Sequence, residues 1–321
     1  MTRLAVADLV DGLRKGDRRA VARLISLVED GAAEASEAIR EVYPLTGHAS
    51  TIGLTGAPGA GKSSIIDGLV VRARAEDRSV GVIACDPTSP FSGGALLGDR
   101  VRMQQHALDE KVFIRSMATR GHLGGLSLAA PEAMRVLEAA GSDVVIVETV
   151  GVGQSEVEVA KQADTTIVVL APGMGDAIQA AKAGVLEIAD IFCVNKADKD
   201  GANETARDVR GMLELGHGRD ASWEVPIVMT STVTEDGLDA LYAAIRKHEE
   251  HLRTGDRLAE RRRERFGAEI REIVGERLKA ALEQAAGADV LEKLTEDVLE
   301  RRLDPYSAAD RLFERFGIRI E

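Results

Sequence analysis

Cysteine and long apolar runs are scarce in this chain. Its 321 residues include two cysteines, Cys85 and Cys193, each within an apolar, strand-like run, so we expect small core side chains and find no sign of an oxidising compartment. No run approaches the ~20 apolar residues of a membrane-spanning helix. The N-terminal segment carries Asp8 and Asp11 and has no apolar stretch of signal-peptide length. We therefore expect a cytoplasmic protein that does not enter a membrane.

Basic residues are also fewer than acidic residues. Lysine plus arginine number 41 and aspartate plus glutamate 53, and 41 minus 53 gives a net charge of −12. This balance argues against non-specific binding to nucleic acid or to an anionic membrane. The basic cluster RRRER at 261–265 is interleaved with acid, and we expect a solvated helix face there rather than a nucleic-acid patch. Hydrophobic residues make up 45% of the chain, enough for a substantial core.

Apolar runs and amphipathic stretches alternate in the middle of the chain. Most of the stretches between the runs have the length and spacing of helices, an alternation typical of a mostly parallel sheet with helices on both faces. We therefore predict an α/β fold. The expected strands are residues 51–55, 79–85, 112–116, 143–148, 165–170, 190–194 and 225–229.

The two ends of the chain have helical patterns instead. Residues 4–44 place apolar side chains at helical spacing, and charged, Leu- and Ala-rich sequence runs from about residue 237 to the end. We predict an N-terminal helical segment at 1–46, a central domain at 47–252 and a C-terminal helical extension at 253–321. An apolar stripe in the extension could pack on its own core or on a second subunit. It comprises Ile270, Ile273, Val274, Leu278, Ala281 and Leu282.

A glycine-rich loop follows the first expected strand. The sequence GAPGAGKSS at 56–64 fits the pattern G-x-x-x-x-G-K-[ST]. Its glycines allow backbone N–H groups to surround phosphate oxygens, Lys62 supplies a positive charge, and the Ser63 hydroxyl can bind Mg²⁺. A helix beginning near Lys62 would point its positive end at the same anion. We expect a nucleotide phosphate site formed by Gly56, Ala57, Pro58, Gly59, Ala60, Gly61, Lys62, Ser63 and Ser64.

A second motif indicates the base of the nucleotide. The expected strand DIFCVN leads into NKAD, which supplies Asn195, Lys196 and Asp198. An aspartate there can accept hydrogen bonds from the ring N–H and the exocyclic amine of guanine, whereas adenine presents an acceptor at the ring nitrogen and lacks that amine. The four residues are a weak match alone, but a strong one at the mouth of a later parallel strand in a chain with a phosphate loop. Asp198 therefore favours GTP.

The loop after the last expected strand is a weaker candidate for the same site. The sequence TSTVTEDG at 230–237 ends that strand. Backbone N–H groups near Ser231 and Thr232 could contact the guanine. A plain helix N-cap is the structural alternative, and the sequence leaves the two open.

Three carboxylates end or follow expected strands. The segment ETVGVGQSE begins at Glu148, directly after the apolar run VVIV, so this carboxylate falls where the strands of a parallel sheet meet their ligands. Asp86 ends the second expected strand and Asp99 follows a Ser/Gly segment, so both could reach the Mg²⁺ and phosphate side of the site. Turn formation and helix capping are the structural alternatives.

Taken together, six segments resemble the MeaB/ArgK family of P-loop GTPases, the group associated with methylmalonyl-CoA mutase. The segments are GAPGAGKSS, DPTSPFSGGALLGDRVRM, MATRGHLGGLS, ETVGVGQSE, APGMGDAIQAAKAG and NKAD. They occur in the family's order over about residues 45–250, and the helical ends of the chain also fit.

The resemblance implies a Mg²⁺-dependent GTPase that hydrolyses GTP to GDP and phosphate. It also implies a chaperone that gates adenosylcobalamin loading into an acyl-CoA mutase of the methylmalonyl-CoA mutase type and protects that mutase from inactivation. Family members are commonly homodimers through C-terminal helices, which would assign the apolar stripe of the extension to a partner subunit.

Position by position, the resemblance places Lys62 and Ser63 at the phosphate and Mg²⁺ site. It places Asp86, Asp99 and Glu148 around Mg²⁺ and the attacking water. Three segments match the family's mobile switches, and the third contains Lys182, a further catalytic candidate; they are residues 86–102, 148–160 and 171–182.

The expected mechanism depends on a glycine in the second switch segment. Gly151, three residues after Glu148, would let a backbone N–H approach the γ-phosphate. In Ras-type GTPases a glutamine follows that glycine directly, whereas Gln154 lies three residues later here, so a helix-start role competes with a water-positioning one. We expect slow hydrolysis by the isolated protein, near the roughly 10⁻⁴ per second of unassisted Ras, and acceleration by a partner that orders the switches.

Three other functions stay open at this point. A kinase or ATPase linked to lysine, arginine and ornithine transport would need ATP and an acceptor site, and NKAD argues against ATP. A nickel-insertion GTPase would need Cys and His ligands, but both cysteines lie in strand-like runs, and we expect His248 and His251 to be a solvated surface pair. The third is a non-catalytic binding module in which hydrolysis is only a timer.

Overall fold

The computed structural model describes residues 5–86, 104–106, 108–118, 125–149, 161–173, 188–215, 222–286 and 288–315. The chain divides into two compact units, Met1–Arg262 and Arg263–Glu321, and each is described by itself. Among the described residues, no helix is both long enough and apolar enough to cross a membrane.

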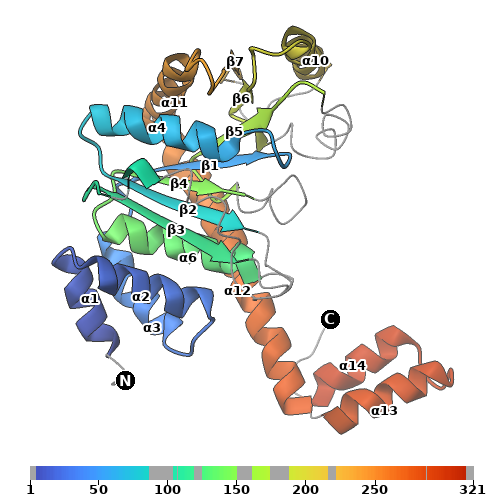
Figure 1. Cartoon of the computed structure of the whole chain (residues 1–321). Coiled ribbons are helices and arrows are strands. Elements are labelled where there is room, and N and C mark those ends of the chain that lie inside the picture. Colours follow the sequence, from blue (N-terminus) through green and yellow to red (C-terminus); the bar gives the residue numbers. More distant parts are fainter. Residues whose placement is uncertain are drawn as a thin grey trace. The chain divides into compact units, whose positions relative to one another are not determined.

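A seven-stranded parallel sheet forms the centre of the first unit, as the sequence predicts (Figure 1). The strand order is β3-β2-β4-β1-β5-β6-β7. The strands are β1 (Ser50–Gly56), β2 (Val80–Asp86), β3 (Val112–Ala118), β4 (Val144–Glu148), β5 (Thr165–Leu170), β6 (Ile191–Val194) and β7 (Ile227–Met229).

The helices also follow the expected alternation. Those in the described residues of the first unit are α1 (Val6–Arg14), α2 (Arg18–Glu29), α3 (Ala35–Val42), α4 (Lys62–Ala75), α6 (Gly125–Ala139), α10 (Ala202–Leu215) and α11 (Leu238–Arg253), with short 3₁₀ turns η1 (Tyr43–Leu45) and η2 (Gln104–His106). The long helix α12 (Arg257–Ala286) begins in this unit and continues into the second, which also holds α13 (Ala288–Leu299) and α14 (Pro305–Arg315).

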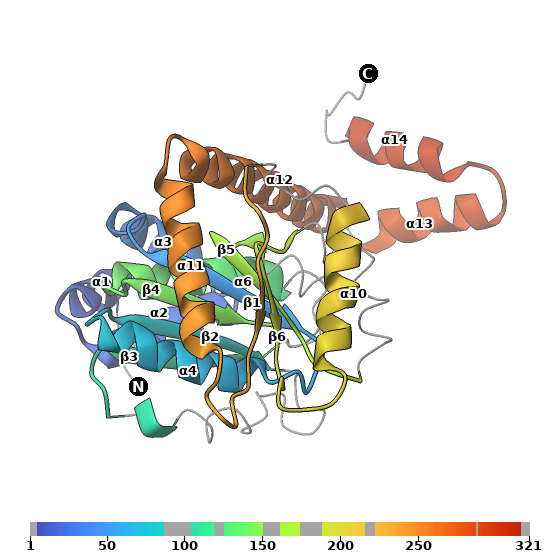
Figure 2. The same cartoon turned by 90° about the horizontal axis from the view of Figure 1, so that it is seen from above.

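Alternate side chains of the strands form separate hydrophobic clusters on the two faces of the sheet. On one face Ile52, Val82 and Ile146 pack with α4 and α11. On the other face Ile83 and Val147 pack with α6. Helices α2 and α3 cover α6 in turn, and α1 packs against α2 and α3 (Figures 1 and 2). Because a strand reverses its side chains at each residue, a run that is apolar throughout must be covered on both sides. The N-terminal helices therefore belong to the core of the first unit.

The order of the strands sets where a ligand can bind. β1 lies between β4 and β5, and all three run parallel, so their carboxyl ends lie next to one another. The chain leaves β1 toward β2 on one side and later reaches β5 on the other. Ligands of open parallel sheets bind at the carboxyl ends of the strands beside such a change of direction. The loop after β1 lies at this point.

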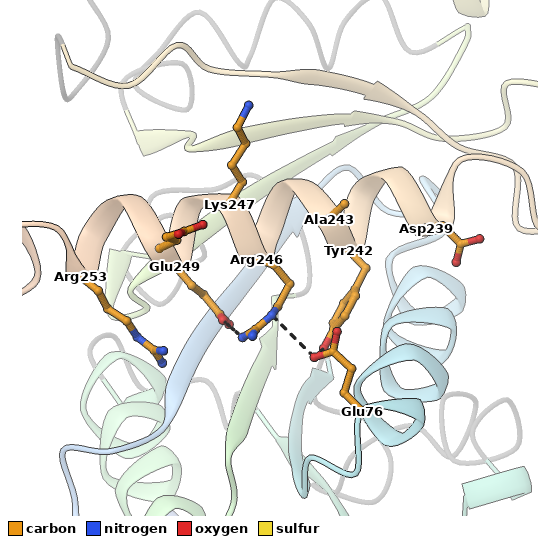
Figure 3. A pocket seen from close by; sticks show the side chains of 9 residues that line it. Glu76, Asp239, Tyr242, Ala243, Arg246, Lys247, Glu249 and Arg253 are labelled. Carbon is orange, nitrogen blue, oxygen red and sulfur yellow. Dashed lines mark hydrogen bonds and ion pairs between the residues drawn. The ribbon is translucent and has the colours of Figure 1, made fainter.

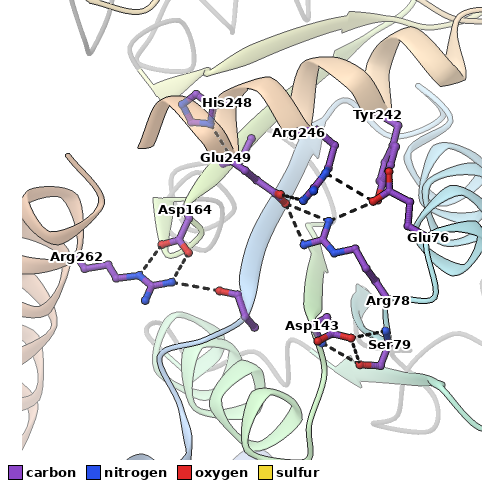
Figure 4. A network of polar contacts seen from close by, with 12 residues as sticks. Glu76, Arg78, Ser79, Asp143, Asp164, Tyr242, Arg246, His248, Glu249 and Arg262 are labelled. Carbon is purple, nitrogen blue, oxygen red and sulfur yellow. Dashed lines mark hydrogen bonds and ion pairs between the residues drawn. The ribbon is translucent and has the colours of Figure 1, made fainter. Parts of the chain in front are cut away.

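At the opposite edge of the sheet, where the strands begin, the contacts of two arginines contradict our expectation that RRRER forms a solvated helix face. The Arg261 guanidinium binds both carboxylate oxygens of Asp190, at the start of β6, and Arg262 binds both oxygens of Asp164, at the start of β5 (Figure 4 shows the second pair). Asp164 and Asp190 are each 3% exposed. Burial alone would lower the pKa of Arg262, but the hydrogen bond and negative charge of Asp164 outweigh it and raise that pKa. These two arginines fasten the start of α12 to the sheet.

The histidine pair on α11 is also not the solvated pair that we expected. His248 is 1% exposed; its Nδ1 lies 2.9 Å from Thr165 Oγ1 and its Nε2 lies 3.5 Å from Asp190 Oδ1. The Trp223 ring lies 4.7 Å from the His248 ring and 5.1 Å from the His251 ring, between centroids. An Asp–His–Thr row of this kind is similar to a hydrolase triad in outline, but Thr165 is 1% exposed, so no substrate reaches its hydroxyl.

The second unit is a small helical assembly. Asp304 caps α14: its carboxylate accepts hydrogen bonds from the Ser307 hydroxyl and from the backbone N–H groups of Tyr306 and Ser307. Along α12, Ile270, Val274 and Leu278 are 61%, 58% and 41% exposed. Their spacing of four residues places them on one face of the helix. An apolar face is therefore open on this unit.

Candidate functional site

The loop between β1 and α4 has the backbone of a phosphate cradle. Gly56, Gly59 and Gly61 have positive φ angles of 152°, 77° and 95°, which other residues adopt only with strain. A Cβ at Gly56 would lie 2.2 Å from the Val169 carbonyl oxygen of β5. α4 begins at Lys62, so its first N–H groups and its positive end face the loop. The sequence pattern is thus matched by the required strand, loop and helix.

Lys62 and Ser63 begin this helix and lie under the loop. Lys62 is 5% exposed, and its ammonium donates hydrogen bonds to the carbonyl oxygens of Gly56 at 2.9 Å and of Ala57 at 3.3 Å. Because of these bonds, the loop folds around the lysine and its ammonium group lies on the inner side of the loop. Ser63 is 6% exposed, and its hydroxyl donates to Glu148 Oε1 at 2.9 Å. The candidate Mg²⁺ ligands Ser63 and Glu148 therefore come together, from α4 and β4.

The NKAD segment lies against the same loop. Asn195, at the end of β6, is 1% exposed and donates from Nδ2 to the Ala60 carbonyl oxygen at 2.8 Å. Lys196 has a φ of 58° and donates from Nζ to the Gly59 carbonyl oxygen at 2.7 Å. A Cβ at Gly61 would lie 2.2 Å from Asn195 Nδ2. The phosphate loop and the predicted guanine loop thus form one connected structure.

The end of the NKAD segment meets the loop after β7. The Ser231 hydroxyl donates to Asp198 Oδ1 at 2.6 Å, and this bond is the main reason that the pKa of Asp198 lies below its ordinary value of 3.8. The carboxylate is therefore ionised at neutral pH, the form that accepts hydrogen bonds from guanine. Gly237, and not Ser231, is the N-cap of α11, so the N-cap alternative for Ser231 is wrong. Thr232 is half-buried beside it.

Other predicted site residues lie outside the described part of the chain. They are Asp99, Gly151, Gln154 and Lys182, with most of the three expected switch segments. The backbone of Asp86 ends β2, as expected, but its side chain also lies outside what the structure describes. The roles of these residues stay predictions.

One residue at the site was not among the predicted contact residues, although it begins the TSTVTEDG segment. Thr230, 0% exposed, donates from Oγ1 to Asn195 Oδ1 at 3.2 Å. Its neighbour in the next strand, Cys193, lies with Sγ 3.2 Å from the same hydroxyl. A threonine at a strand end is ordinary β sequence, and only the pairing of β6 with β7 reveals its partner.

Comparison with known proteins decides the family. The family model described as "Methylmalonyl Co-A mutase-associated GTPase MeaB" matches residues 21–287. The chain belongs to the MeaB family of GTPases. A GTPase-named protein of Pyrococcus abyssi is 50% identical over 311 residues, 96% of each chain. The mouse protein named "Methylmalonic aciduria type A homolog, mitochondrial" is 30% identical over 332 residues, 97% of this chain and 79% of that protein.

A solved structure has a similar fold over the whole chain. The structure described as "Crystal structure of LAO/AO transport system kinase" matches with a TM-score of 0.76 and 28% identity, over 99% of each chain. The protein is therefore a P-loop GTPase, and membership of the family implies that it binds GTP and GDP.

A surface groove of about 760 Å³ lies along α11, away from the carboxyl edge of the sheet (Figure 3). In it Arg246 bridges Glu76 and Glu249. The remaining lining mixes both signs of charge: Asp239, Tyr242, Ala243, Lys247, Glu250 and Arg253. Four carboxylates and three basic groups line the groove, so charges of both signs lie close together there.

Proposed function

We propose that this GTPase is a chaperone for an adenosylcobalamin-dependent acyl-CoA mutase, gating cofactor loading and protecting the mutase from inactivation. The observation that carries the proposal is the match of residues 21–287 to a family described by its association with methylmalonyl-CoA mutase. The mouse relative named for methylmalonic aciduria supports it. The partner would be methylmalonyl-CoA mutase, isobutyryl-CoA mutase or a related isomerase of the cytoplasm.

The test is a binding and rate measurement with candidate mutases. Each purified mutase is mixed with the protein in the presence of GDP or of a non-hydrolysable GTP analogue, and complex formation and the GTPase rate are measured. We expect a nucleotide-dependent complex with one mutase and at least tenfold faster hydrolysis in it, as partner-ordered switches allow. If no mutase binds or changes the rate, the chaperone role is refuted, while the GTPase assignment stands.

For the nucleotide site, we propose that the loop 56–61 surrounds the phosphates, that Lys62 offsets their charge, and that Asp198 accepts hydrogen bonds from guanine. The supporting contacts are those of Lys62 with the loop and of Ser231 with Asp198. Changing Asp198 to Asn replaces a hydrogen-bond acceptor by an amide that can donate. Xanthine has a carbonyl where guanine has its exocyclic amine, so the variant suits xanthine. We expect the variant to prefer XTP to GTP. An unchanged preference for GTP would show that Asp198 does not contact the base.

A metal ion is proposed at the Ser63–Glu148 pair. Both residues offer oxygen, the donor that Mg²⁺ prefers, and their side-chain oxygens lie 2.9 Å apart in a buried setting next to the phosphate loop. Mg²⁺, when bound, supplies positive charge to the phosphates. Asp86 and Asp99 are proposed to complete this site, and Gly151 and Lys182 to contact the γ-phosphate side.

The Glu148→Gln variant tests this assignment, because the amide keeps the shape and removes the charge. We expect GDP affinity to become independent of Mg²⁺ and hydrolysis to fall at least tenfold. The matched control is Glu214→Gln, an exposed change on α10 that should leave both unaffected. Mg²⁺ dependence equal to that of the native protein would exclude Glu148 as a ligand.

We also propose that the protein forms a homodimer through its C-terminal helices. The exposed stripe of Ile270, Val274 and Leu278 supports this, because an apolar helix face of this kind is usually covered by a partner. Val274→Glu should give a monomer in sedimentation experiments. The control Glu276→Lys, an exposed charge change on the same helix, should not. A native protein that sediments as a monomer would refute the dimer.

A second candidate function comes from the similar solved structure, which is described as a transport system kinase. A kinase would need ATP and an acceptor protein. ATP binding as tight as GTP binding in a competition assay would favour it. Nickel insertion has less support, because no group of three or more potential metal-binding side chains occurs in the described ranges.

A further inference from the structure

The chain that leads from η2 to β3 lies along α4, the helix that begins at the phosphate loop. Residues 104–106 and 108–111, which we call the α4-bound segment, contact this helix at successive places. The contacts are those of Gln105 and His106 with Asp67, of Asp109 with Arg74, and of Lys111 with Asp77. Both chains advance in the same direction, so the segment follows α4 from its second turn to just past its end.

Asp67 holds the first part of this segment with both oxygens of its carboxylate. Its Oδ2 accepts from Gln105 Nε2 at 2.6 Å, and its Oδ1 lies 3.1 Å from His106 Nε2. Because a carboxylate can only accept, the His106 ring carries a proton on Nε2. The His106 side chain is 9% exposed and the Asp67 side chain 25%, so water screens this contact less than a contact between two exposed groups. One residue of α4 thus fixes two neighbouring residues of the segment.

Asp67 lies one helical turn from the proposed metal site. It follows Ser63 by four residues, which places the two side chains on the same side of α4, about 6 Å apart along the helix axis. Ser63 donates to Glu148 Oε1 at 2.9 Å. The point at which the segment is fixed is therefore close to the pair of oxygens that we assign to Mg²⁺.

The chain connects this contact to a further candidate ligand. Asp99, which lies outside the described residues, precedes Gln104 by five residues. Five residues span at most about 17 Å, so a fixed Gln104 limits how far the Asp99 backbone can lie from α4. A residue near a fixed end of a chain loses less conformational entropy on binding than one near a free end. A carboxylate that is tethered in this way binds a metal ion more easily.

We infer that Asp67 is a positioning residue for GTP hydrolysis, because its contacts with Gln105 and His106 tether the chain that carries Asp99 one turn from the metal site. The inference rests on the proposal that Ser63, Glu148 and Asp99 bind Mg²⁺. Asp67 itself contacts neither the metal ion nor the nucleotide; it acts through the α4-bound segment.

The test uses Asp67→Asn, which keeps the shape but offers one acceptor and one donor to two donors. We expect the Mg²⁺ concentration for half-maximal GTP hydrolysis to rise about fivefold, which corresponds to about 1 kcal/mol, the size of one hydrogen bond. The kcat at saturating Mg²⁺ should stay within about twofold, because Asp67 does not contact the reacting groups. GDP affinity in EDTA should also stay native, because the phosphate and guanine loops keep their contacts.

A matched control and a rescue separate positioning from a general loss of packing. Asp77→Asn is the control: it changes the carboxylate that binds Lys111 at the far end of the segment, and the Asp77 side chain is 81% exposed. This variant should keep the native Mg²⁺ requirement. His106→Leu removes the donor and should raise the Mg²⁺ requirement, whereas His106→Gln keeps a donor and should restore it. If Asp67→Asn does not fold, Gln105→Ala, an exposed change that removes the 2.6 Å bond, takes its place with the same expected direction.

A double-mutant cycle with Asp67→Ala decides whether His106 and Asp67 act through their contact. In the Asp67→Ala background His106→Leu should change the Mg²⁺ requirement by less than about twofold, because its partner is already gone. A full fivefold effect there, a native Mg²⁺ requirement in Asp67→Asn, or an equal rise in Asp77→Asn would overturn the inference alone. Hydrolysis by the native protein that does not depend on Mg²⁺ would overturn it together with the proposed metal site.

Discussion

The Arg261–Asp190 contact predicts a large loss of stability in Arg261→Ala. Asp190 is 3% exposed, and Arg261 donates to both of its carboxylate oxygens. Without the guanidinium the carboxylate would keep the backbone N–H of Thr166, at 2.7 Å, and the His248 ring, at 3.5 Å. Removing one partner of a buried ion pair leaves a charge that water cannot reach, which is much more costly than losing an exposed pair.

The magnitude follows from the burial of the two partners. Breaking a buried pair typically costs about 3–5 kcal/mol. The Arg261 side chain keeps 10% exposure and Asp190 keeps one strong backbone donor, so we expect the lower end, about 3 kcal/mol. The matched control is Arg14→Ala, whose pair with Asp11 is 51% and 63% exposed. An exposed pair of this kind is worth less than about 0.5 kcal/mol.

Trp223 provides the assay, because it is the one tryptophan of the sequence and its indole N–H donates to the Asp190 carbonyl at 2.8 Å. Urea unfolding followed by tryptophan fluorescence therefore reports on this contact. With a denaturant slope of about 3 kcal/mol per molar, the midpoint should fall by about 1 M in Arg261→Ala and by less than about 0.2 M in Arg14→Ala. Equal midpoints for the two variants would refute the buried-pair reasoning.

Three more predictions concern single groups. Gly61→Ala should abolish GDP binding in equilibrium dialysis, because φ is 95° and the added Cβ would lie 2.2 Å from Asn195 Nδ2; native affinity would contradict this loop geometry. Burial alone would raise the pKa of Asp143, but hydrogen bonds from the Ser79 hydroxyl and N–H outweigh it and lower that pKa below 3.8. The resulting stability is present above about pH 4 and lost as pH falls through the folded pKa, so the melting-temperature advantage over Asp143→Asn should shrink in acid. Cys193, with a pKa raised to about 12 by burial, should react with a thiol reagent at about pH 8 only after unfolding, and prompt labelling of the native protein would contradict this.

The sheet and the phosphate loop could be predicted because their signals are local. Each of the seven apolar runs overlaps one strand. The largest boundary differences are two residues, at the end of β3, where 112–116 was expected and the strand covers Val112–Ala118, and at the start of β7, where 225–229 was expected and the strand covers Ile227–Met229. The phosphate loop needs glycines, a lysine and a serine within nine residues, so its pattern is visible without any tertiary information. Contacts such as Lys62 with Gly56 then follow from the local geometry.

The amino edge could not be predicted, because its partners are far apart in sequence. Arg261 and Asp190 are separated by 71 residues, and Arg262 and Asp164 by 98. A helical pattern shows which side chains share a face, but it does not show what that face meets. The pattern of RRRER therefore predicts a solvated face, although two of its arginines bind buried aspartates. The prediction for His248 is wrong for the same reason.

Strand β6 runs from the amino edge of the sheet, where the arginines bind, to the carboxyl edge, where the nucleotide loops lie. Because this strand is short, the effects of mutations at the two edges can be compared. Asp190 precedes the strand, Asn195 follows it, and four residues lie between them. If the strand is rigid but each edge is held by its own bonds, Arg261→Ala should lower stability and leave the GDP affinity of the folded protein unchanged. A loss of GDP affinity in Arg261→Ala, measured where the variant is fully folded, would show instead that the anchor of α12 and the nucleotide loops are energetically coupled through β6.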